Sequence, residues 1–141
     1  MAFILAADEC IVVTTPEPTS ITDAYSIIKH IVLKEMTKPM YVVMNRTQEK
    51  REGKQMLDKF QQLVQQFLKK DLTCLGAIPN DRVVQKAVIA QTPYVLYDER
   101  AAVSKAIKSI AANYLQEGKV EWKEEEQLSF VQRLQRLLKK R

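Results

Sequence analysis

Three continuously apolar segments alternate with long amphipathic segments along this chain, and that alternation constrains its fold more than any other feature. The apolar runs are Glu9–Thr15, Pro39–Asn45 and Leu72–Ile78. The first is apolar on both sides, which is the pattern of a parallel strand covered on both faces. Strands separated by helix-length segments require crossover connections, so the sequence predicts right-handed βαβ units.

Helical periodicity fills the intervals between the predicted strands. Ser20 and Asp23 are spaced as a capping box for the first helix, Asp81 is placed to cap a short helix, and Asp98 is placed to cap a last one. The predicted fold class is α/β, with a three-layer parallel sheet and flanking helices. The apolar stripes of the three longer helices are Ile21, Ala24, Tyr25, Ile28, Ile31 and Val32; Met56, Leu57, Phe60, Leu63, Val64, Phe67 and Leu68; and Val103, Ala106, Ile107, Ile110 and Tyr114.

A three-stranded parallel sheet leaves two edges with unpaired backbone groups, and parallel sheets are usually larger. The sequence therefore resembles part of a domain. We expect exposed sheet faces and, as a consequence, dimerisation, strand exchange or marginal stability.

Four blocks of sequence resemble the C-terminal half of the MinD/ParA-type P-loop ATPases, in particular the FlhG (YlxH) branch that sets flagellar number and position. They are AADECIVVTTPEPTSITDAY, MNR, LGAIPNDRVVQKAV and QTPYVLYDERAAVSKAIKSIA, in this order. The resemblance implies a partial P-loop fold of the MinD type. For the full-length family it implies ATP or ADP with magnesium, a homodimer, and flagellar assembly proteins as partners.

The phosphate-binding part of that family has no counterpart in these 141 residues. Gly53, Gly76 and Gly118 are the only glycines, and none lies in a GxxxxGK pattern. Without a phosphate loop or switch aspartates, the groups that catalyse phosphoryl transfer are missing. We expect no catalytic residue here, no ATP hydrolysis by this chain alone, and weak nucleotide affinity or none.

The resemblance assigns candidate nucleotide-site residues to the ends of two predicted strands. Asn45 matches the asparagine that reads the adenine edge, and Arg46 would flank the ring. The loop Pro79, Asn80 and Asp81 matches the segment that closes over the base. The residues alone also allow simpler roles, because Asn45 could end a strand in a turn and Asp81 could only cap a helix.

Two acidic residues near the first strand also receive roles from the resemblance. Asp23 matches the aspartate that pairs with the phosphate-loop lysine, and Glu17 lies in a segment that faces the dimer partner. No metal site is predicted, because Cys10, Cys74 and His30 belong to no ligand cluster. We expect both cysteines in the core and His30 on the surface.

The basic character of the chain resides in its last residues. The net charge of +5 equals the five cations of residues 128–141, because the remaining 17 basic and 17 acidic residues cancel. We expect a domain over residues 1–117, a charged linker over 118–127 and an amphipathic helix over 128–141. Its apolar stripe is Phe130, Val131, Leu134, Leu137 and Leu138, and its polar side carries Gln132, Arg133, Arg136 and Lys140.

Three roles are open for this helix: docking on its own domain, binding nucleic acid, or lying on an anionic membrane surface. We favour the membrane, because the segment has no acid and a charged linker precedes it, and the resemblance implies such a helix. Aromatic residues are not interleaved with the cations, which disfavours single-stranded nucleic acid. No segment is apolar enough to span a bilayer, so the expected location is cytoplasmic, peripheral on the inner face of the cell membrane.

A function of a different class stays open. A small α/β domain with an exposed sheet edge could be a non-catalytic interaction module that self-associates or binds a protein partner or nucleic acid, with no nucleotide role.

Overall fold

A three-stranded parallel sheet organises the computed structural model, which describes residues 1–35, 37–117 and 129–140. The strand order is β1-β2-β3, so β2 is central and the other two form the edges. Cys10 pairs with Met40 and Tyr41 with Thr73. The strands are β1 (Cys10–Thr14), β2 (Met40–Thr47) and β3 (Thr73–Pro79).

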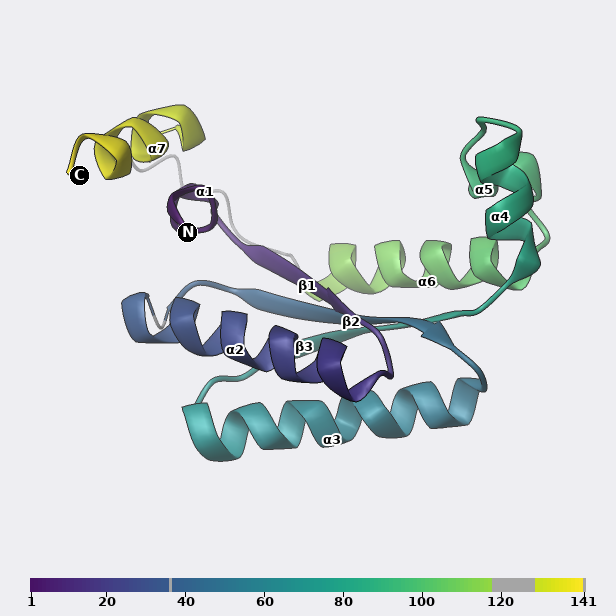
Figure 1. Ribbon diagram of the computed structural model, residues 1–141, viewed down its shortest axis with the longest axis horizontal. Helices are drawn as coiled ribbons and strands as arrows, with labels where there is room; N and C mark the ends of the chain where they lie inside the picture. Colours follow the sequence, from purple (N-terminus) through teal and green to yellow (C-terminus); the bar gives the residue numbers. More distant parts are fainter. Residues whose placement is uncertain (36, 118–128, 141) are drawn as a thin grey trace.

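Seven helices are described, and the larger ones lie on both faces of the sheet. Figure 1 shows α2 and α3 on one face and α6 on the other, while α1 and α7 lie side by side beyond the start of β1. The helices are α1 (Ala2–Ala6), α2 (Pro18–Lys34), α3 (Lys50–Leu68), α4 (Arg82–Ile89), α5 (Tyr94–Tyr97), α6 (Ala102–Glu117) and α7 (Phe130–Lys139). The predicted α/β fold class is confirmed, whereas the short helix α1 was not predicted.

Two apolar clusters form the core, one on each face of the sheet. Val42 and Met44 of β2 face the cluster under α2 and α3, whereas Tyr41 and Val43 face the cluster under α6. The α3 helix approaches the sheet at Gly53, where a Cβ atom would lie 2.9 Å from the side chains of Ala77 and Thr47. This close approach requires glycine.

One expectation about the first strand is wrong. Ile11 and Val13 of β1 are 50% and 60% exposed, so this strand is covered on one face only. The reason is that α6 packs along β3 and no helix of the described residues covers that side of β1. An exposed sheet face of this kind is what we expected of a partial domain.

Minor expectations about single residues have mixed outcomes. His30 is exposed, as predicted, and its Nδ1 lies 2.7 Å from the carbonyl oxygen of Ser26. Cys10 and Cys74 are half-buried and pack against the core cluster under α2 and α3. No helix in the described part of the chain is long and apolar enough to cross a membrane. The predicted linker, residues 118–127, lies outside the described residues.

Candidate functional site

The candidate nucleotide-site residues lie at the carboxyl ends of the parallel strands, which in open α/β sheets is where ligands bind. Asn45 and Arg46 belong to the last part of β2, and Pro79 ends β3. Parallel pairing brings both segments to the same edge of the sheet, because Thr47 is in register with Pro79.

A bulge in β2 shapes the first of these segments. Between Met44 and Thr47 the register with β3 shifts, so that β2 carries one more residue than its partner strand. Arg46 adopts a left-handed conformation with φ 59°, and its backbone N–H donates to Oδ1 of Asn45 at 2.9 Å. The half-buried Asn45 side chain therefore folds back over its own turn, and the exposed Arg46 projects from it.

Thr47 joins this bulge to the loop that follows β3. Its carbonyl oxygen accepts the N–H of Asn80 at 2.9 Å, and its Oγ1 donates to the carbonyl oxygen of Ile78 at 3.3 Å. Thr47 is 1% exposed, so these bonds are shielded from water. The sequence did not predict this role of Thr47. The only signal was its β-branched side chain, which favours a strand.

Asp81 caps two helices with one carboxylate. Its Oδ1 accepts the N–H of Val83 in α4 at 2.9 Å, as predicted for a helix cap, and its Oδ2 accepts the N–H of Val103 in α6 at 3.3 Å. Negative charge at a helix N-terminus is stabilising. Asp81 thus fixes the loop after β3 relative to both helices that follow it.

The prediction that Asp98 caps α6 is wrong. Its Oδ1 accepts the N–H of Arg100, inside the turn between α5 and α6, at 3.1 Å. The helix α6 begins later, at Ala102, and its first turn is capped by Asp81 from across the fold. Local spacing could not reveal a cap supplied from 22 residues away.

The predicted capping box of Ser20 and Asp23 is also absent. The α2 helix begins at Pro18, because the fixed φ of proline suits the first helical position, and Glu17 is the N-cap residue without a side-chain cap. Ser20 therefore lies inside the first turn, where its Oγ accepts the N–H of Thr15 at 2.9 Å. Glu17 and Asp23 are both exposed.

The structure brings together only part of the predicted site. The segments Asn45–Arg46 and Pro79–Asp81 are joined directly through Thr47. Glu17 and Asp23 lie at the same edge of the sheet, after β1. Among the described residues no hydrogen bond or ion pair links these two side chains to the other segments.

Two proteins are similar to this chain in sequence, and one solved structure is similar to it in fold. The chain is 34% identical over 111 residues to the antiactivator FleN of Pseudomonas aeruginosa, a match that covers 79% of this chain and 40% of FleN. It is 28% identical over 141 residues to the flagellum site-determining protein YlxH of Helicobacter pylori, covering 97% of this chain and 47% of YlxH. The chain is similar in sequence to FleN and YlxH.

The fold of this chain agrees with that of a solved structure. The crystal structure of the Pyrococcus furiosus cell division ATPase MinD superimposes with a TM-score of 0.58 at 24% identity, over 80% of this chain and 44% of that one. The chain spans less than half the length of each of these three relatives. No protein-family model matches it.

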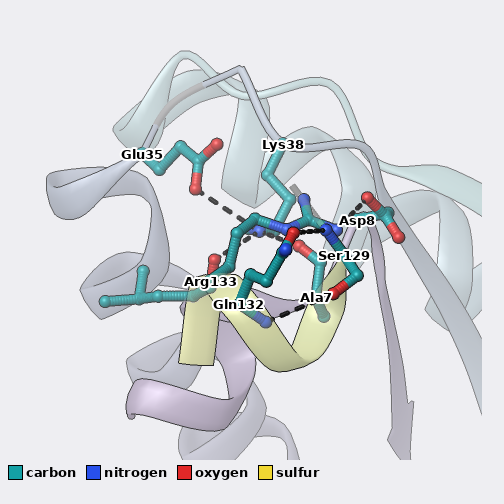
Figure 2. Close-up of polar contacts among 8 residues, drawn as sticks. Ala7, Asp8, Glu35, Lys38, Ser129, Gln132 and Arg133 are labelled. Carbon is teal, nitrogen blue, oxygen red and sulfur yellow. Dashed lines mark hydrogen bonds and ion pairs between the residues drawn. The ribbon is translucent and has the colours of Figure 1, made fainter. Parts of the chain in front are cut away.

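The C-terminal helix α7 lies against α1. It begins with a capping box, in which Ser129 Oγ accepts the N–H of Gln132 at 3.3 Å and Gln132 accepts the N–H of Ser129 at 2.9 Å. Figure 2 shows Arg133 of this helix pointing toward Asp8, with which it forms an ion pair. Leu137 and Leu5 of α1 line a common shallow pocket.

This contact with α1 covers the apolar stripe of α7 only in part. Leu134 and Leu137 are half-buried, whereas Phe130, Val131 and Leu138 are 41%, 58% and 49% exposed. Arg136 and Lys140 face solvent, and the terminal Arg141 lies outside the described residues. The helix keeps an exposed apolar side beside exposed cations.

A buried lysine holds α1 in place beneath α7. Lys38 is 4% exposed, and its Nζ donates to the carbonyl oxygens of Leu5 at 3.2 Å and of Ala7, and pairs with Glu35 at 3.3 Å (Figure 2). Lys70 Nζ donates in turn to the carbonyl oxygen of Lys38 at 2.6 Å. Burial lowers the pKa of Lys70 from its usual value.

Proposed function

We propose that this chain is the C-terminal portion of an FlhG-type, MinD-like ATPase that regulates flagellar number or placement through ATP-dependent dimerisation and reversible membrane binding. In this proposal Asn45, Arg46 and the loop Pro79–Asp81 form the adenine-side wall of the nucleotide site. The observation that carries it is the direct bond from Asn80 N–H to the Thr47 carbonyl, which holds both segments at one edge of the sheet. The name of YlxH, a flagellum site-determining protein, supports the flagellar role.

The residues present suit a purine base. The Asn45 carboxamide uses one lone pair of Oδ1 for the Arg46 N–H, which leaves its second lone pair and its NH₂ group for the acceptor and donor of an adenine edge. The exposed planar guanidinium of Arg46 can lie over a base. Both oxygens of Asp81 already accept helix N–H groups, so its part is to position the loop.

Phosphate and magnesium would be held by groups that these 141 residues do not encode. Asp23, exposed one turn into α2, would pair with a phosphate-loop lysine, and exposed Glu17 would face the second subunit. We expect no magnesium-dependent phosphate release from this chain alone. Turnover above that of an Asn45→Ala variant, measured on the purified chain, would contradict this expectation.

A thermal-shift titration tests the base-side wall. Bound ligand stabilises by RT ln(1 + [L]/Kd), so ADP at a concentration equal to its Kd stabilises by about 0.4 kcal/mol. We expect millimolar ADP to raise the melting temperature of this chain and GDP to raise it less. Asn45→Ala should remove the difference between ADP and GDP, whereas Gln62→Ala, an exposed amide on α3, should keep it.

Membrane binding is proposed for α7. Each cation near an anionic surface contributes roughly 1 kcal/mol before screening, and the exposed side chains of Phe130, Val131 and Leu138 supply an apolar side. Such an anchor is reversible. Co-sedimentation with phosphatidylserine vesicles should exceed that with phosphatidylcholine vesicles, and equal binding to both would contradict the proposal.

A second candidate function is self-association without a nucleotide role, as an interaction module. The exposed Ile11 and Val13 on β1, together with the open edge of that strand, favour it. If neither ADP nor ATP shifts the melting temperature at millimolar concentration, the function of this chain is that of an interaction module without a nucleotide role.

A further inference from the structure

A large groove runs along the edge of the sheet opposite to β1. It has a volume of about 1030 Å³ and lies between α3 and α6, with the edge strand β3 at its floor. Figure 1 shows these two helices on opposite faces of the sheet, so that the edge of β3 lies between them. The groove is therefore separate from the exposed face of β1.

The groove combines an apolar floor with a cationic rim. Its floor and inner walls come mainly from apolar groups, and its rim carries Lys50, Arg51 and Lys54 from α3 and Lys105 from α6, all exposed. Asp58 is the one acid among the described lining residues. The apolar lining residues are Leu57, Cys74, Leu75, Ala77, Pro79, Ala102, Ala106 and Ile110.

The backbone of β3 is irregular at its outer edge, which disfavours hydrogen bonding to a further strand. The register with β2 shifts at Leu75, and Gly76 has φ 146°, so the strand is irregular at its centre. The Leu75 carbonyl, moreover, already accepts Asn113 Nδ2 at 2.7 Å. A ligand of this groove gains most from side chains on the apolar floor and charges on the rim, and little from backbone pairing.

We propose that this groove binds an acidic amphipathic helix of a partner protein. Such a helix would place an apolar stripe on the floor and carboxylates beside the rim cations on both walls. Single-stranded nucleic acid fits less well, because none of the described lining residues is aromatic and the floor offers nothing to a sugar-phosphate backbone. The groove shares Thr47 and Pro79 with the segments of the proposed nucleotide site, but Asn45 and Arg46 do not line it. The rim variants Lys54→Glu and Lys105→Glu lie outside those segments, so a failure of this proposal and a failure of the nucleotide role are distinguishable.

Selection from a display library of short helix-forming peptides tests this proposal on the full chain. We expect the enriched peptides to combine an apolar stripe with flanking Asp or Glu. Their affinity, measured by fluorescence polarisation, should fall roughly tenfold or more in the double variant Lys54→Glu/Lys105→Glu, which reverses one charge on each wall. Ser109→Trp, which fills the groove from an exposed helix position, should also abolish binding.

Lys29→Glu provides the matched control, because Lys29 is exposed on α2, outside the groove. It should bind the enriched peptides as the unaltered chain does, and circular dichroism should show that every variant is folded. The proposal is overturned if no peptide is enriched, if the enriched peptides lack acids, or if they bind all variants equally. Tighter groove-dependent binding of a single-stranded oligonucleotide, or occupation by a second copy that Ser109→Trp disrupts, would overturn it as well.

Discussion

Asp81 has the largest structural role of any single charged residue at the candidate site. One carboxylate accepts the first-turn N–H groups of α4 and α6, which are otherwise unsatisfied helix donors. The loop that would close over a base is thereby held at the point where two helices begin. Its capping role was predictable for α4 from the sequence, but its second bond was not.

Asp81→Ala should reduce the free energy of unfolding by about 2 kcal/mol, because each lost cap costs about 1 kcal/mol. Asp81→Asn should lose less, since its amide keeps one acceptor oxygen. Urea unfolding measures both effects. Asp23→Ala is the control and should change stability by less than about 0.5 kcal/mol, because Asp23 forms no capping box. A loss at Asp23 as large as at Asp81 would contradict the capping geometry.

The thiol of Cys74 should lose its proton at a higher pH than an ordinary cysteine. Burial, with a smaller contribution from the Asp58 carboxylate, raises its pKa from 9.0 to about 11. The native state therefore keeps the proton while the unfolded chain releases it, so the unfolding free energy should fall as the pH rises from 9.0 to about 11. Cys74→Ala should remove this part of the pH dependence.

Alkylation of the Cys10→Ser variant by iodoacetamide measures the same pKa directly, because only the thiolate reacts. The rate should reach half of its maximum near pH 11 in the native chain and near pH 9.0 in urea. A native midpoint near the urea value would show that the thiol is not shielded.

Among the elements, α7 differs most from the rest of the fold. It contacts α1 through the Arg133–Asp8 ion pair and through Leu137, but it leaves one apolar side open. A helix that served only as a core element would bury its apolar stripe. The partial coverage is consistent with a helix that can exchange between α1 and an anionic surface.

Leu138→Glu should abolish co-sedimentation with phosphatidylserine vesicles, because it places a charge on the apolar side of α7. Gln135→Glu introduces the same charge at an exposed position of the same helix and should retain most of the binding. If both variants bind equally well, the apolar side of α7 is not the membrane-binding surface.

The exposed face of β1 is the surface of the molecule that we expect to control its oligomeric state in solution. Ile11 and Val13 expose an apolar face next to a strand edge that pairs with no other strand of the described residues, an arrangement that promotes association. Sedimentation equilibrium should find concentration-dependent self-association, and Val13→Glu should shift the chain toward monomer. Val88→Glu on α4, at a position that is 70% exposed, should not. A monomeric unaltered chain would contradict this account.

The sequence predicted the sheet, the main helices and the cap at Asp81 because these features depend on local periodicity and spacing. It did not predict the burial of Lys38, whose acceptors are carbonyl oxygens more than 30 residues away. The bulge at Arg46 and the role of Thr47 depend on how β2 pairs with β3, and pairing leaves no local signal. The capping box failed because Pro18 starts α2 earlier than Ser20 suggested.

NMR can show whether Asn45–Arg46 and Pro79–Asp81 form the base-side wall of an adenine nucleotide site, as we propose. In ¹H–¹⁵N spectra of this chain, millimolar ADP should shift the amide signals of Arg46, Thr47, Asn80 and Asp81 more than those of other residues. GDP should shift them less, and Asn45→Ala should abolish the preference for ADP. Unchanged signals at both segments, or equal shifts with ADP and GDP, would contradict the claim.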